Sequence, residues 1–114
     1  MGINHCTLSG NLTRNAELRS TASGVSALSF GIAFNERRRR KDSDEWEEVA
    51  NFIDCALFGA RADALADYLV KGTKVSLDGK LRWNQWEDEF GEKHSKIELI
   101  VNDLEFMSPR ASEG

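Results

Sequence analysis

The most informative part of the chain is Asn51-Phe52-Ile53-Asp54-Cys55-Ala56-Leu57-Phe58-Gly59. In an extended strand, successive side chains point to opposite faces, so odd-numbered and even-numbered residues separate. The odd-numbered side chains form an apolar row suited to a core: Val49, Ile53, Cys55 and Leu57. The even-numbered side is small or polar in the middle and ends in the rings of Phe52 and Phe58. A strand covered on both faces would be apolar throughout, so the pattern predicts a strand with one open face.

The two rings allow two interpretations. Phe52 and Phe58 either pack beneath a loop or a neighbouring strand, or remain exposed for a functional reason, because exposed aromatic patches usually have one. To decide between these interpretations, we consider the neighbouring elements and the other residues expected on the open face.

A short helix is predicted directly after this strand, over residues 60–71. Four apolar residues follow the i, i+3, i+4, i+7 spacing of one helix face: Ala62, Leu65, Ala66 and Leu69. Gly72 is placed to end the helix, and Lys71 suits the negative end of the helix dipole. So short a helix buries little by itself, so we expect it to plug one end of a sheet.

The composition indicates one soluble, acidic domain. The chain has 114 residues and a net charge of −4, so any nucleic-acid site must be a local patch of positive charge. No apolar run reaches the ~18 residues of a membrane span and no signal peptide precedes Asn4, so we expect a cytoplasmic protein. Cys6 and Cys55 are not spaced as a metal or redox pair, and we expect buried thiols in preference to a disulfide.

Alternating apolar and polar residues predict five strands, over residues 3–12, 25–36, 49–58, 73–87 and 94–107. Residues 17–20 are expected to resume the first strand as a short extended segment, and Gly10 marks a bulge or a sharp bend within it. The last strand has apolar residues on both parities, so either both of its sides are buried or a bulge switches its faces.

Five strands with one helix between the third and the fourth are the order of an OB-fold, a five-stranded Greek-key barrel. We therefore expect an all-β fold with a small helix over residues 1–107, followed by a short disordered end at residues 108–114. The outer sides of strands two, three and four would form one continuous face. That face would combine rings and cations: Phe52, Phe58, Lys80, Arg82 and Trp86. Rings stack on bases and cations follow phosphates, so the combination favours single-stranded nucleic acid.

Several short motifs in this order resemble the DNA-binding core of bacterial single-stranded DNA-binding proteins. They are Gly10-Asn11-Leu12 followed by Glu17-Leu18-Arg19, then Leu57-Phe58-Gly59, Tyr68-Leu69-Val70-Lys71-Gly72, Gly79-Lys80-Leu81-Arg82 and Trp86. The resemblance runs from about residue 2 to residue 106 without large gaps. In that family, aromatic stacking combined with phosphate contacts is the established mode of binding.

The resemblance implies specific roles for residues of this chain. The family's base-stacking rings correspond to Phe52, Phe58 and Trp86. Its cationic contacts correspond to Arg19, Lys71, Arg82 and, less closely, His5. It also implies a homotetramer, a dimer of dimers paired through the first strands, that protects single strands in DNA replication, recombination and repair.

The chain departs from the family pattern in several places. Arg38 stands where the family usually has a tryptophan, and a guanidinium can also stack on a base. Asp54 replaces a frequent cation and would repel phosphate. Trp83 is an additional ring that either compensates by stacking on DNA or only packs its hairpin. The family's long, acidic-tipped tail, which recruits replication and repair proteins, is absent before Gly114, so it was removed or never existed.

The basic run of residues 37–41 lies between the second and third strands and is followed by acidic residues around Trp46. One interpretation is a solvated hairpin whose two halves pair across the turn, each exposed pair contributing about 0–1 kcal/mol. The other is a basic arm over the DNA face, poorly ordered until phosphate displaces its acidic half, with Arg37, Arg38 and Arg39 among its contacts.

Enzyme chemistry is not supported by the sequence. The carboxylates are scattered over different strands without metal-ligand spacing, the two histidines have no evident nucleophile beside them, and no Gly-rich phosphate loop is present. We therefore expect neither catalysis nor a cofactor or metal. The alternative is an OB-fold subunit that binds protein instead, as in primosomal or assembly factors, because the fold alone does not separate these functions.

Overall fold

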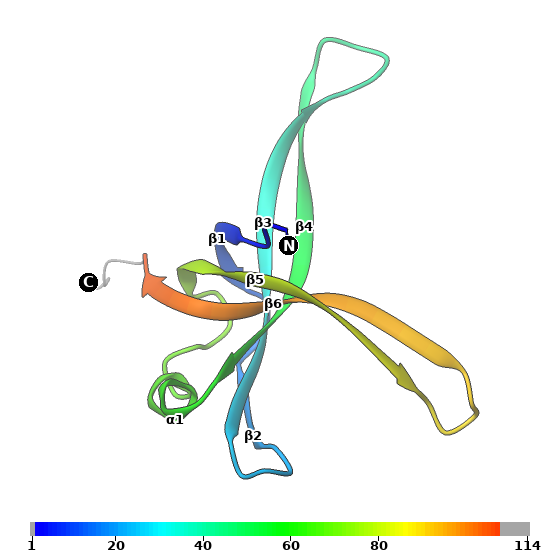
Figure 1. Cartoon of the computed structure of the whole chain (residues 1–114). Coiled ribbons are helices and arrows are strands. Elements are labelled where there is room, and N and C mark those ends of the chain that lie inside the picture. Colours follow the sequence, from blue (N-terminus) through cyan, green and yellow to red (C-terminus); the bar gives the residue numbers. More distant parts are fainter. Residues whose placement is uncertain (1, 108–114) are drawn as a thin grey trace.

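Six strands and one short helix make up residues 2–107, the part of the chain that the computed structural model describes. The predicted end at residues 108–114 lies outside it. In chain order, the elements are β1 (Cys6–Leu12), β2 (Glu17–Ser20), β3 (Ser26–Arg39), β4 (Trp46–Phe58), α1 (Ala60–Leu65), β5 (Lys74–Glu87) and β6 (Lys93–Phe106) (Figure 1).

The strands form one sheet in the order β1-β5-β6-β4-β3-β2, and an additional pairing of β1 with β3 closes it. β1 pairs with β5 from Cys6 to Asn11, and its last two residues then pair with Ala33 and Ile32 of β3. β2 continues the path of β1 along β3 as a separate short strand. The prediction of a five-stranded OB-fold barrel is thus confirmed, with the first predicted strand divided into β1 and β2.

The barrel closes where backbones approach each other too closely for a side chain. A Cβ on Gly10 would lie 2.3 Å from the carbonyl oxygen of Ala33, and a Cβ on Gly79 would lie 2.1 Å from that of Ile100. Glycine is therefore required where β1 crosses to β3 and where β5 bends along β6. The predicted sharp bend at Gly10 corresponds to the first of these crossings.

A bulge in β6 explains its apolar residues on both parities. Asp78 pairs with Asp103 and Gly79 pairs with Val101, so Asn102 is an additional residue without a partner in the ladder. Leu99 points into the core before the bulge and Leu104 does so after it, although their parities differ. The alternative of a face-switching bulge is confirmed, and both sides of the strand are buried only at Glu98 and Leu99, before the bulge.

The barrel interior is filled mainly by apolar side chains of β3, β4, β5 and β6, including Phe30, Leu57 and Leu77. Cys55 is buried among them, and burial raises the pKa of its thiol to about 12. Cys6 is only half-buried, and both thiols are free. One expectation for β4 is wrong: Ala56 is buried, although the alternation placed it on the open face.

The helix is shorter than predicted. It ends at Leu65 instead of Lys71, and turns lead from there to β5. Leu69 is nevertheless fully buried, so its apolar side chain reflects burial and not helical conformation. Lys71 therefore does not lie at a helix end, and the predicted dipole interaction is wrong. Among residues 2–107, no helix has the length and apolar character needed to cross a bilayer.

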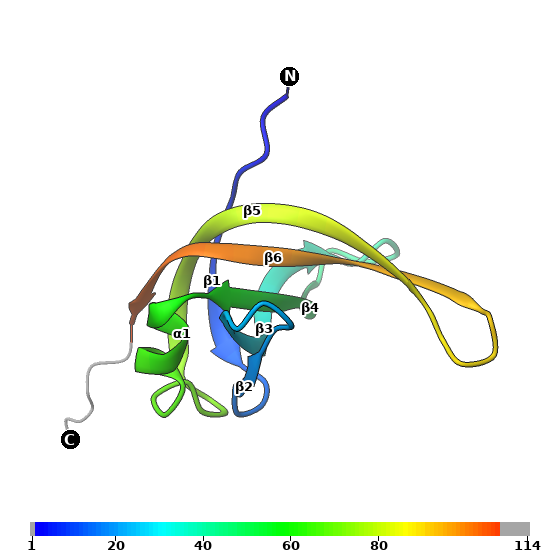
Figure 2. The same ribbon diagram turned by 60° about the horizontal axis from the view of Figure 1, so that its bottom comes forward.

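Two hairpins project from the barrel in different directions (Figures 1 and 2). The β3–β4 arm, residues 35–50, remains paired up to Arg39 and Trp46, and the β5–β6 arm, residues 82–97, remains paired up to Glu87 and Lys93. The radius of gyration is 16.5 Å, compared with about 13 Å for a compact domain of this length. The expectation of a poorly ordered basic run is wrong for Arg37 to Arg39, which lie within β3.

Candidate nucleic-acid interface

Three neighbouring strands present their even-numbered side chains on one side of the sheet. β6 lies between β4 and β5, because Asp54 pairs with Glu98 and Glu98 pairs with Arg82. Directly paired residues share a face of the sheet. We call this surface the outer face, and its members are Phe52, Asp54, Phe58, Arg82, Asn84, Trp86, His94, Lys96 and Glu98.

The rings of the outer face are open to solvent. Phe52 is 71% exposed, Trp86 47% and Phe58 37%, so the interpretation that the two phenylalanines pack beneath a loop is wrong. The Arg82 guanidinium carbon lies 5.7 Å from the centroid of the Phe58 ring, within cation–π range. A cation from β5 is therefore held against a ring from β4, which is the arrangement of charge and stacking surface that a nucleotide needs.

The carboxylates of the outer face are neutralised by cations. Asp54 accepts a hydrogen bond from Lys96 (3.0 Å) and lies 3.7 Å from the guanidinium of Arg14. Glu98, which is buried, accepts hydrogen bonds from Arg82 (3.1 Å) and from the Asn84 amide. Arg14 and Lys96 were not predicted as site residues. The position of β6 beside β4 brings Lys96 there, and Arg14 lies over Asp54 from the segment after β1.

Comparison with known proteins identifies the family of this chain. The model of the single-strand binding protein family matches residues 3–107. The chain belongs to this family. It is 44% identical over 107 residues to a single-stranded DNA-binding protein of Borreliella burgdorferi, covering 93% of this chain and 70% of the relative. A Treponema pallidum single-stranded DNA-binding protein is 40% identical over 105 residues, covering 92% of this chain and 58% of the relative.

Solved structures agree with this assignment. A deletion mutant of the single-stranded DNA binding protein from Thermus aquaticus superposes with a TM-score of 0.83 at 28% identity, covering 96% of this chain and 53% of that one. A Plasmodium falciparum SSB complex with single-stranded DNA has the same fold, with a TM-score of 0.85 at 22% identity, and covers 95% of this chain and 97% of that one.

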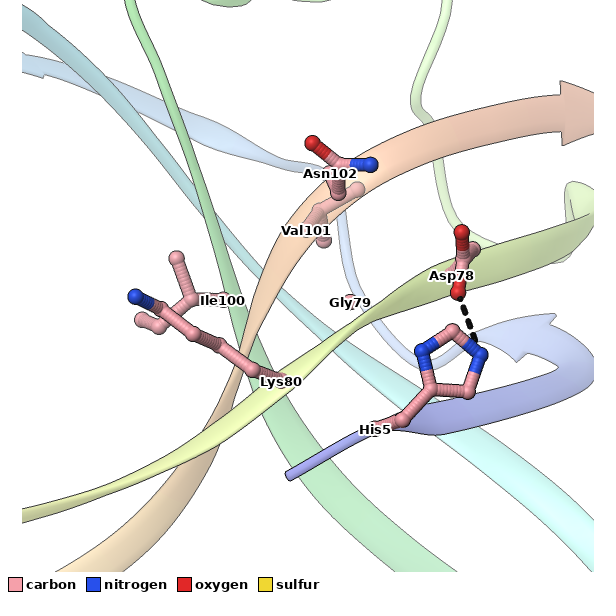
Figure 3. Close-up of a pocket in the computed structure, with 7 residues that line it drawn as sticks. All are labelled: His5, Asp78, Gly79, Lys80, Ile100, Val101 and Asn102. Carbon is pink, nitrogen blue, oxygen red and sulfur yellow. Dashed lines mark ion pairs between the residues drawn. The ribbon is translucent and has the colours of Figure 1, made fainter. Parts of the chain in front are cut away.

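Other predicted site residues of this family member lie around the outer face. Arg19 pairs with Ala27, which pairs with Phe58, so Arg19 lies two strands from that ring on the same side. Lys80 pairs with Ile100, which pairs with Ala56, so Lys80 extends the outer face along β5. Its side chain leads away from the ion pair between His5 and Asp78 (3.0 Å; Figure 3).

Lys71 and Trp83 are not brought to the outer face. The backbone N–H of Lys71 donates to Asn15 in the turn before β5. Trp83 is 57% exposed and pairs with Ile97, so it lies on the opposite side of the β5–β6 arm from Trp86. A single strand that follows Trp86 therefore does not meet Trp83 on the same surface.

The tip of the β5–β6 arm gathers three groups of metal-ligand type. Ligand atoms of Asp88, Glu92 and His94 lie within 4.8 Å of one another. The Asp88 carboxylate is already engaged by the His94 ring (2.8 Å) and by two backbone N–H groups. The hydrogen bond from His94 is the main reason that the pKa of Asp88 is lowered. The ring of His94 also stacks on Trp86, with centroids 5.6 Å apart, so this cluster positions the indole.

Replacing Asp54 by asparagine is expected to strengthen the binding of single-stranded DNA by up to about 1 kcal/mol. The carboxylate occupies Lys96 and Arg14 in the free protein, and an amide would release both cations to phosphate. Titration of the variant and the parent with the same oligonucleotide measures the effect. Asp103→Asn is the matched control, because Asp103 pairs with Arg61 instead of an outer-face cation. An equal gain in both variants would mean that the loss of one negative charge explains the effect, and that the release of Lys96 and Arg14 does not.

Proposed function

We propose that the outer face binds single-stranded DNA with little sequence preference, and that the protein is a binding protein and not an enzyme. The observation that carries this proposal is the set of exposed rings on one surface, Phe52, Phe58 and Trp86, with Arg82 held against one of them. Every base has a flat face, so rings hold bases without reading their identity. The names of the relatives, which are single-stranded DNA-binding proteins, support the same function.

Each ring would hold one base, and the cations beside it would contact the adjoining phosphates. Arg82, Lys96 and Arg14 lie in the middle of the surface, and Arg19 lies beyond Phe58. Phosphate would compete with Asp54 and Glu98 for these cations. Because the net charge of the chain is −4, this local cluster has to provide the attraction.

We further propose that the protein acts as a cytoplasmic homotetramer, a dimer of dimers, in replication, recombination and repair. Within residues 2–107, the first residues of β1 pair only with β5, which leaves their other edge able to pair with a second copy. Family membership supports this assembly. Recruitment of replication and repair proteins is a property of the family's tail, and we assign no residues to it.

A fluorescence titration with oligo-dT at several salt concentrations tests the proposed function. Tryptophan emission should fall on binding, because Trp86 would stack on a base. The logarithm of affinity should fall with the logarithm of salt concentration, with a slope of about −0.7 for each phosphate contacted. Duplex of the same length should bind more weakly. If emission does not change and no binding is detected, the OB-fold would serve the alternative function, binding of another protein.

A further inference from the structure

The β3–β4 arm separates its charges between its two sides. The register pairs Arg37 with Glu48 and Arg39 with Trp46, on the side that also carries Phe52. The opposite side carries Arg38, paired with Glu47, and Glu36. Two cations and one carboxylate therefore lie on the Phe52 side, against one cation and two carboxylates on the other. Arg39 is already paired with Asp44 near the tip, so Arg37 is the cation that this side offers to a phosphate backbone, whereas the opposite side is net acidic.

The Phe52 side also holds an exposed tryptophan that is not part of the hydrophobic core. Trp46 is 59% exposed near the tip of the arm. The guanidinium carbon of Arg37 lies 5.4 Å from the centroid of its ring, within cation–π range. One face of the indole is thus engaged by a cation while much of the ring remains open, as for Phe58 beneath Arg82.

The side chains between Trp46 and Phe52 determine whether a nucleic-acid strand can run from one ring to the other. Two residue pairs lie between the two rings, the short Asn35 and Ala50 next to Phe52, and then Arg37 and Glu48 next to Trp46. Phe52 itself lies opposite Ala33. Six residues of extended strand span about 20 Å, a distance that a few unstacked nucleotides can cover. Among the described residues, the long side chains between the two rings are those of Arg37 and Glu48, so a strand that runs from Phe52 along the arm would pass Arg37 before it reaches Trp46.

We propose that Trp46 and Arg37 form an additional base-stacking subsite, continuous with Phe52, and that single-stranded DNA follows this side of the arm. The inference rests on the proposed function and extends it. It also reassigns the stacking role that the resemblance suggested for Arg38. Arg38 lies on the opposite and net acidic side, so Trp46 supplies the aromatic surface of the arm instead.

A protein that retains Trp46 as its only tryptophan tests the subsite directly. In the variant Trp83→Phe/Trp86→Phe, the emission of Trp46 should be quenched when oligo-dT is added, because the base would stack on the indole. The comparison protein, Trp46→Phe/Trp86→Phe, retains Trp83 on the other side of the β5–β6 arm and should be quenched less. Equal quenching in both proteins, or none in the first, would overturn the inference.

Two neighbouring arginines provide a matched pair for the phosphate contact. Arg37→Ala and Arg38→Ala remove the same charge from adjacent positions on opposite sides of β3. We expect Arg37→Ala to lower the magnitude of the salt slope by about 0.7, equivalent to one phosphate, and Arg38→Ala to lower it less. Trp46→Ala should weaken binding at least about fivefold, with the thermal midpoint unchanged.

The results also separate this inference from the proposed function. If the parent binds oligo-dT but Trp46→Ala and Arg37→Ala have no larger effect than Arg38→Ala, the arm subsite is excluded and the proposed function stands. If the parent itself does not bind, both the proposed function and the subsite are overturned. If Trp46→Ala lowers both affinity and stability, the single-tryptophan quenching decides whether the indole meets the base.

Discussion

Alanine in place of Phe52, and separately in place of Trp86, is expected to weaken the binding of oligo-dT by about 1–3 kcal/mol, or roughly 5- to 140-fold. Each substitution removes a ring on which one base would stack. The loss should be similar for oligonucleotides of different sequence, because stacking requires only the flat face of a base. Equilibrium titrations of the parent and the two variants at one salt concentration measure it.

The stability of the same variants provides the control. Phe52 is 71% exposed and Trp86 is 47% exposed, so their removal should change the free energy of unfolding little. Phe30→Ala is the contrasting variant, because Phe30 is fully buried and its loss should cost about 3–5 kcal/mol. If Phe52→Ala is destabilised as much as Phe30→Ala, the ring is structural, and if it binds DNA like the parent, it is not a stacking platform.

Alanine in place of Gly79 should destabilise the fold by about 1–3 kcal/mol or more. The added Cβ would meet the carbonyl oxygen of Ile100 at 2.1 Å, so the backbone of β5 or β6 has to move. The position adjoins the β6 bulge, where the face of that strand switches. Urea unfolding of the variant and the parent measures the change.

Gly2→Ala is the matched control for Gly79→Ala. Apart from its chain neighbours, no described residue comes within 4 Å of a Cβ at Gly2, so this variant should unfold at the same urea concentration as the parent. If Gly79→Ala also unfolds with the parent, β5 and β6 have room to separate, and close approach does not determine this part of the barrel.

The barrel was predictable because burial on one side of a strand imposes alternation. The odd-numbered residues of β4 and the single apolar row of β3 showed the inside of the sheet directly. The helix was predicted too long for the same reason. Leu69 continues the helical spacing, but it lies in the segment after α1, where it is buried without being helical. The spacing of apolar residues indicates which residues are buried and does not by itself indicate their backbone conformation.

The interface was only partly predictable because it depends on which strands become neighbours. Alternation placed Phe52, Phe58 and Trp86 correctly on an exposed surface. Lys96 was missed because β6 runs parallel to β4, a pairing between strands that are distant in the sequence. We propose Arg37 and Trp46 in place of Arg38 because the pairing of β3 with β4 continues beyond the predicted strand ends and places Arg38 on the opposite side of the arm.

β3 has a buried part within the barrel and an exposed part in the β3–β4 arm, and we expect the two parts to open separately. Leu28, Phe30 and Ile32 are fully buried, whereas the last five residues of the same strand are exposed. Native proteins open in local units whose free energies range from almost zero at frayed ends to the full stability in the core. We therefore expect amide protons near the tip of the β3–β4 arm to exchange with solvent sooner than those at Phe30. A ligand that bends or twists this arm would therefore shift only this local opening equilibrium, and we expect the barrel to stay closed.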